Sequence, residues 1–124
     1  MADRNEYLVQ TLENGNVLIS EEVIASIAAL AIREIDGVFG LSISSTIDLR
    51  NIINRKNFRK GIRVVIEGEN VDINCNLVVK AGETVMDVAK NVQEAILSEV
   101  SAMTGIQPRR VNVNICGVAV PKAQ

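Results

Sequence analysis

Hydrophobic residues recur at three- and four-residue spacing in two stretches of the sequence, which is typical of helices with one buried side. The first stretch follows Ser20, whose hydroxyl can accept a hydrogen bond from a helix-start amide, and it ends at Gly37. The second follows Thr84, which forms a capping-box pattern with Asp87, and it ends at Gly105. The expected buried stripes are Val23, Ile24, Ile27, Ala28, Ala31 and Ile35, then Val85, Val88, Ala89, Val92, Ile96, Val100 and Met103.

Elsewhere apolar and polar residues alternate, which predicts strands. Residues 62–67 and 71–80 alternate most clearly, and Gly68-Glu69-Asn70 between them is a hairpin turn signal. Shorter strands are expected at residues 17–19, 38–43 and 111–115. Residues 44–60 fit either a short helix or an ordered loop.

This order of elements predicts an α+β two-layer sandwich, in which two main helices pack on one face of a mostly antiparallel sheet. One domain is expected over residues 15–120, with an N-terminal arm at 1–14 and a C-terminal tail at 121–124. The face toward the helices is predicted to hold Ile62, Val64, Ile66, Ile73, Cys75, Leu77, Val113 and Ile115. The opposite face is predicted to show Arg63, Glu67, Asp72, Asn74, Asn76, Asn112 and Asn114.

The amino-acid composition excludes several classes of catalytic and metal-binding site. The 124 residues are 48% hydrophobic and 23% charged, which is typical of a globular domain. There is no histidine, so histidine-dependent catalytic pairs and histidine-ligated metal sites are excluded. Two cysteines cannot form a four-thiolate zinc site within one chain. We therefore expect that the protein is not an enzyme, that it has no catalytic residue, and that it binds no metal or cofactor.

The location is inferred from hydrophobic segments. The first ten residues have no apolar core typical of a signal peptide. The longest uncharged apolar stretch, Val23–Ile32, has ten residues and is too short to span a bilayer. We expect a cytoplasmic protein that does not insert into the membrane directly.

Three local features could carry chemistry, but each has a simpler structural explanation. Glu21 and Glu22 suit a helix start without any catalytic role. Cys116 is expected to be partly exposed, yet no neighbouring cation lowers its pKa. The GxxG pattern at 37–40 has Val and Phe between its glycines, whereas a loop that clamps a nucleic-acid backbone favours lysine or arginine there. A turn that leads into a strand is therefore the better interpretation.

Charge is unevenly distributed along the chain, whose net charge is −2. Residues 49–66 contain six lysine or arginine residues and no aspartate or glutamate. Within them Arg55, Lys56, Arg59 and Lys60 form the candidate interaction patch, suited to phosphate, an anionic membrane surface or an acidic protein. A solvated connector is the other interpretation. The asparagine-lined sheet face also allows self-association through that face or through an edge strand.

Several short motifs, in their order and spacing, resemble the alkaline shock protein family, the general-stress and envelope-stress-response proteins of Gram-positive bacteria. These motifs are 17–24, 35–41, 57–64, 77–82, 92–93, 111–113 and 116–118, and together they cover most of residues 15–120. The resemblance implies a non-enzymatic protein, cytosolic in sequence, with some members held at the membrane by an anchored partner. It supplies no catalytic residue to carry over. The chain lacks the long charged tails of some members and so resembles the short, housekeeping type.

Together these observations predict an interaction or scaffold module for envelope stress or homeostasis, peripheral to the inner face of the cell membrane through a partner. Self-association and a protein partner that is itself membrane-anchored are expected. A nucleic-acid-binding regulator using the basic segment 50–63 is the less favoured alternative, because the chain is acidic overall and has only three aromatic residues.

Overall fold

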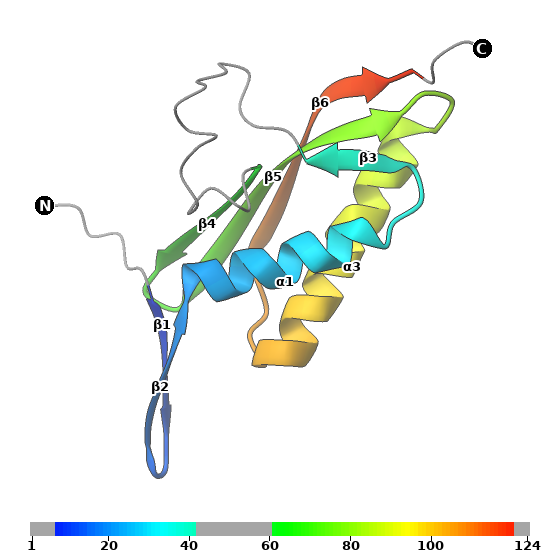
Figure 1. Cartoon of the computed structure of the whole chain (residues 1–124). Coiled ribbons are helices and arrows are strands. Elements are labelled where there is room, and N and C mark those ends of the chain that lie inside the picture. The colour runs from blue at the N-terminus through cyan, green and yellow to red at the C-terminus, as the bar shows by residue number, and fades with distance from the viewer. Residues whose placement is uncertain (1–6, 42–60, 121–124) are drawn as a thin grey trace, which may run out of the picture.

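The computed structural model describes residues 7–41 and 61–120. Both helices lie on one side of the main sheet, and a two-stranded hairpin projects from the body (Figure 1). This arrangement confirms the predicted α+β fold class. The interpretation of residues 44–60 as a helix or loop lies outside the described residues. The elements, in order, are β1 (Tyr7–Leu12), β2 (Gly15–Ser20), α1 (Glu21–Arg33), β3 (Val38–Leu41), β4 (Ile62–Glu67), β5 (Asn70–Lys80), α3 (Val85–Thr104) and β6 (Arg110–Ala119).

Strand β5 is the centre of the main sheet. It pairs antiparallel with β3 and β4, and parallel with β6. Alternate residues of a strand direct their backbone groups to opposite neighbours. The amides of Asn76 and Lys80 donate toward the β4 and β3 side, whereas the carbonyl of Val71 accepts from Arg109 beside β6. Strands β3 and β4 therefore lie end to end along one edge of β5, and β6 occupies the other edge.

The core lies between this sheet and the helices, as the alternation predicted. Val64, Ile66, Ile73, Cys75 and Leu77 are buried, while Ile62, Val113 and Ile115 pack against the core in a partly buried state. Four residues of the predicted stripe of α1 are buried, and so are four of the stripe of α3. These are Ile24, Ile27, Ala28 and Ala31, then Val88, Val92, Ile96 and Val100.

Two predicted core positions are wrong. Val23 is 47% exposed in the first turn of α1, although Ile27 one turn later is buried, so the buried stripe begins at Ile24. Met103 is 63% exposed, because the last turn of α3 borders a groove with Leu30 of α1 instead of the core.

The helix ends agree with the sequence only in part. Ser20 caps α1 as predicted, and its hydroxyl accepts a hydrogen bond from the Val23 amide at 3.2 Å. Gly105 ends α3 in the left-handed conformation, as predicted. Thr84 makes no side-chain capping bond, so the predicted capping box with Asp87 is wrong. Helix α1 ends at Arg33, before the predicted stop at Gly37.

The sequence did not predict a strand before residue 15. Strand β1 pairs antiparallel with β2 along its whole length, from Tyr7 opposite Ser20 to Leu12 opposite Gly15. Leu8 of β1 is 1% exposed and belongs to the core, which anchors the hairpin base. Strand β6 is also longer than expected, since it continues past Ile115 to Ala119.

Candidate interaction surfaces

The β1–β2 hairpin, which we call the projecting hairpin, exposes large apolar side chains on both of its faces. It extends away from the helices and the main sheet (Figure 1). Val9 and Leu18 are cross-strand partners and are 51% and 57% exposed. On the other face Leu12 and Val17 are more than two-fifths exposed. A two-stranded ribbon of this kind is only marginally stable by itself in water, and exposed apolar clusters commonly mark contact sites.

The second surface is the face of the main sheet turned away from α1 and α3, which we call the open sheet face. Two cross-strand amide bonds link β6 to β5 there, and we call them the amide ladder. Asn112 Nδ2 donates to Asn74 Oδ1 at 2.8 Å, and Asn114 Nδ2 donates to Asn76 Oδ1 at 3.0 Å. A side-chain amide has two N–H donors and an oxygen with two lone pairs. Each pair therefore keeps hydrogen-bonding capacity for a partner.

An ion pair closes one end of the ladder. Arg109 donates from Nε to Asp72 Oδ1 at 3.0 Å and from Nη2 to Oδ2 at 2.7 Å, and its Nη2 lies 3.8 Å from Glu67 Oε1. These bonds to Arg109 lower the pKa of Asp72, while desolvation opposes the shift. The geometry fixes the start of β6 against β5 and occupies both carboxylate oxygens of Asp72.

A shallow hollow of about 430 Å³ lies along the same face. Among the lining residues that the structure describes, Arg63 has the only ionisable side chain, and Glu67 and Asp72 are not among them. Glu67, Asp72 and Arg63 are therefore not gathered in this hollow. The described lining residues are Gly61, Ile62, Arg63, Val65, Asn74, Asn76 and Asn114.

The two cysteines lie in different environments. Cys75 is buried in β5, and burial raises its pKa to about 11, so it stays a protonated thiol at neutral pH. Cys116 is exposed, and its Sγ lies 3.8 Å from the Asn114 carbonyl oxygen. Over residues 7–41 and 61–120, no three acidic or cysteine side chains are placed to hold a metal ion.

The GxxG pattern forms a turn and a strand, as the preferred interpretation had it. Gly37 is buried in the turn before β3, and a Cβ at this position would lie 2.7 Å from Val88 Cγ2. Phe39 and Gly40 belong to β3, which pairs with β5. The pattern therefore provides no free backbone loop for a nucleic-acid clamp.

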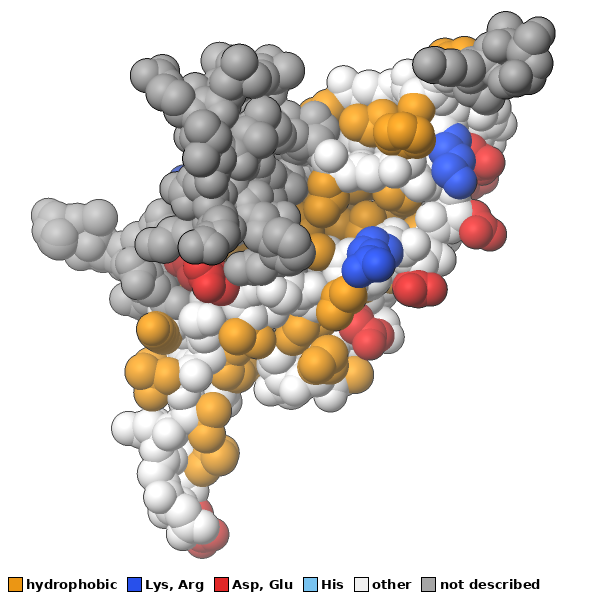
Figure 2. All heavy atoms as spheres, viewed as in Figure 1, with side chains coloured by type: hydrophobic (Ala, Val, Ile, Leu, Met, Phe, Trp, Pro, Cys, Tyr) orange, Lys and Arg blue, Asp and Glu red, His pale blue; other side chains and the backbone are white. Residues whose placement is uncertain are grey.

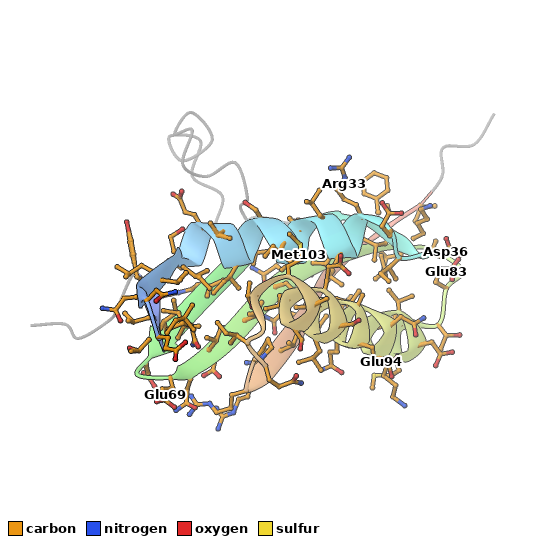
Figure 3. The ribbon with its side chains drawn as sticks, turned by 90° about the horizontal axis from the view of Figure 1, so that it is seen from below. Arg33, Asp36, Glu69, Glu83, Glu94 and Met103 are labelled. Carbon is orange, nitrogen blue, oxygen red and sulfur yellow. The ribbon has the colours of Figure 1, made fainter. Side chains whose placement is uncertain are left out.

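The helical face is mainly acidic at its edges. Figure 2 shows apolar side chains along α1 beside acidic groups, with the projecting hairpin below. Asp36 and Glu83 lie close together where the turn before β3 meets the start of α3, and Glu94 projects from α3 on the side away from α1 (Figure 3). The candidate interaction patch of Arg55, Lys56, Arg59 and Lys60 lies outside the described residues and stays a prediction.

Comparison with known proteins decides the family. Residues 9–120 match a family model described as the ASP23 family, with a cell envelope-related function. The chain belongs to the alkaline shock protein family. The resemblance carried by the short motifs is thus confirmed, and so is the link to the cell envelope at the level of the family.

Relatives of this alkaline shock family protein cover most of its length. The uncharacterized protein YloU of Bacillus subtilis is 33% identical over 108 residues, which are 86% of this chain and 90% of YloU. YqhY of the same organism is 31% identical over 104 residues, 84% of this chain and 77% of YqhY. A stress response regulator gls24 homolog of Streptococcus pyogenes is 23% identical, covering 84% of this chain and 59% of that protein.

A solved MamM C-terminal domain is similar over 78% of this chain and 98% of that domain, at 16% identity and a TM-score of 0.48. In the described parts of the alkaline shock family protein, neither helix has the length and hydrophobicity needed to cross a membrane.

Proposed function

We propose that this protein is a non-enzymatic interaction module of the cytoplasmic side of the cell envelope, with a scaffold role in envelope stress or homeostasis. It binds a protein partner that is itself held in the membrane, and it binds copies of itself. Family membership supports the envelope connection, and the gls24 homologs support a role in stress.

The projecting hairpin is the observation that carries this proposal. Tyr7, Val9, Leu12, Val17 and Leu18 are each more than two-fifths exposed on a ribbon that stands away from the core. Covering them with a partner removes apolar surface from water at roughly 25 cal/mol per Å² and supports a ribbon that is weak alone. The open sheet face offers amides and one ion pair, which suit recognition by contact.

Substitution on the hairpin tests the proposal. Val9→Thr/Leu18→Thr keeps strand-forming side chains and removes apolar area from one face of the ribbon. Recovery of a membrane-fraction partner by affinity capture should fall several-fold, while the thermal unfolding midpoint changes little. Leu30→Gln is the matched control, because Leu30 is 54% exposed on α1 and lies away from the hairpin. Equal recovery with all three chains would refute a hairpin contact.

The basic segment is tested separately. Reversing Arg55, Lys56, Arg59 and Lys60 to Glu should abolish binding to the partner or to an anionic membrane surface, with little change in thermal unfolding. For a charge-matched comparison, Arg59→Glu/Lys60→Glu is set against Arg33→Glu/Lys80→Glu, since Arg33 and Lys80 are exposed bases outside the segment. Unaltered binding by the charge-reversed variant would show that the candidate interaction patch does not bind the partner or the membrane surface. Binding that is lost on nuclease treatment and falls steeply with salt would favour the nucleic-acid alternative.

A further inference from the structure

The outer edge of β6 is an unprotected strand edge. Within the described residues β5 fills one side of β6, and no other strand pairs with it. Edge strands commonly avoid pairing by means of lysine, proline or a bulge. Residues 111–120 carry no charge and no proline, and the register irregularity falls after Ile115. Over the described residues, Val111–Ile115 is therefore a regular, uncharged edge with no strand paired to its outer side.

The backbone groups on that edge belong to alternate residues. Odd-numbered positions of β5 direct their backbone toward β6, as the bond from Arg109 to the Val71 carbonyl shows. Because Ile73 is in register with Val111, its bonds go to the residues on either side of Val111. Val111, Val113 and Ile115 therefore present their own N–H and C=O groups outward. The Val111 carbonyl already accepts a bond from Gln93 Nε2 of α3 at 2.9 Å.

We propose that two copies of this chain join β6 to β6 in antiparallel fashion, with the two-fold axis at Val113. This register sets Val111 opposite the second copy's Ile115, and Asn112 opposite the second copy's Asn114. Apolar side chains then continue on the helix side of the joined sheet, and amides continue on its open face. The amide ladder becomes a row of asparagines that crosses both copies, which matches the remaining hydrogen-bonding capacity of each pair.

Helix α3 flanks the same edge and carries exposed charged side chains there. The bond from Gln93 to Val111 places this part of α3 beside the β6 edge. Lys90 and Glu94 lie one turn apart on α3 and are exposed, and Glu94 projects on the side away from α1 (Figure 3). A two-fold axis at Val113 sets the second copy's α3 antiparallel to the first, on the same side of the joined sheet. The proposal rests on the proposed function, since it names one partner of the interaction module.

Disulfide trapping tests the register. In a Cys116→Ser background, an equal mixture of Asn112→Cys chains and Asn114→Cys chains should form a linked dimer under mild oxidation. Directly opposed non-hydrogen-bonded residues have Cα atoms about 4.5 Å apart, which is within reach of a disulfide. Each variant alone should give several-fold less product. Cross-linking that is absent from the mixture, or stronger in either variant alone, would overturn this pairing.

Sedimentation of the full chain tests the edge itself. The native chain should show a concentration-dependent mass approaching twice 13.4 kDa. Asn112→Lys/Asn114→Lys places like charges opposite each other and should weaken the dimer by about tenfold or more. Asn70→Lys/Ser98→Lys, at exposed positions outside both β6 and the projecting hairpin, adds the same charge and should leave the dimer unchanged.

Two results separate this inference from the proposed function. A monomeric chain at every concentration overturns the β6 interface, even if the chain still captures a membrane-fraction protein. A cross-linked dimer that captures no envelope partner supports the interface and counts against the proposed function.

Discussion

The turn between α1 and β3 passes so close to α3 that Gly37 has no room for a side chain. Its φ is +95°, and a Cβ would lie 2.7 Å from Val88 Cγ2 and 3.3 Å from Glu83 Cγ. Gly82 has the same φ of +95° with nothing within 4 Å. The two glycines therefore share a backbone requirement, and only Gly37 adds a packing requirement.

Alanine at these two positions should separate the two costs. The left-handed conformation costs an alanine about 1–2 kcal/mol, which applies to both positions. Overpacking against Val88 adds about 1–3 kcal/mol for Gly37→Ala alone. Urea unfolding of both variants measures the difference. Equal losses of stability would contradict the close contact between this turn and α3.

The two thiols should differ in reactivity for a reason seen in the fold. Cys75 is buried with a raised pKa of about 11, whereas Cys116 is exposed on β6. Because the thiolate is the reactive form, a colorimetric thiol reagent at pH 8 should modify one thiol in the native chain and two in denaturant. Cys116→Ala should remove the fast reaction. Two equally fast thiols in the native chain would contradict the burial of β5.

The Arg109–Asp72 pair should contribute to stability in a pH-dependent way. The hydrogen bonds from Arg109 hold the pKa of Asp72 below its ordinary value of 3.8. A lowered pKa stabilises the fold above the ordinary value, and this contribution is lost as the pH falls through the folded-state value. Asp72→Asn should therefore lower the unfolding midpoint slightly at pH 6 and make little difference near pH 2. Both chains are compared by thermal unfolding over that range, and parallel curves would contradict a role for the pair.

At the scale of elements, the two helix starts make an internal comparison. Ser20 Oγ accepts the Val23 amide at 3.2 Å, while Thr84 makes no side-chain capping bond. Ser20→Ala should cost about 1 kcal/mol, which is the usual effect of removing a capping hydroxyl. Thr84→Ala should cost clearly less. Urea unfolding measures both, and a larger loss for Thr84→Ala would reverse the assignment of the caps.

Most helices and strands could be predicted because the periodic pattern of apolar residues continues over many positions in each of them. Strand β5 alternates over eleven residues, and α3 repeats its apolar positions over twenty. Strand β1 could not be predicted, since only Leu8 among its six residues is buried and the others give no alternation between core and solvent. The capping box was wrong because Thr84, although it stands at the N-cap with an extended backbone, makes no side-chain bond to the helix start.

On the open sheet face, the alternation of residues along a strand predicts which side each residue faces but not which residue it pairs with. Alternation placed Asn74, Asn76, Asn112 and Asn114 on the outward side, and the structure agrees. Their pairing depends on the parallel register of β5 and β6, which joins residues 38 positions apart. A local pattern carries no information about that register. The ion pair of Arg109 was missed for the same reason.

At the scale of the whole molecule, contact surfaces lie on different sides of one small core. The projecting hairpin exposes apolar side chains, the open sheet face exposes amides, and the β6 edge exposes backbone groups. A partner on the hairpin and a second copy on β6 can bind together, because the hairpin and β6 are separate elements of the fold (Figure 1). This separation suits a scaffold that links copies of itself to the envelope.

Affinity capture of the full chain from cells of the source organism tests the central claim most directly. Membrane and soluble fractions are kept apart, and each is processed with and without nuclease. The account predicts that a membrane protein is enriched from the membrane fraction and survives nuclease treatment. Loss of every captured protein on nuclease treatment would contradict it and assign the basic segment to nucleic acid.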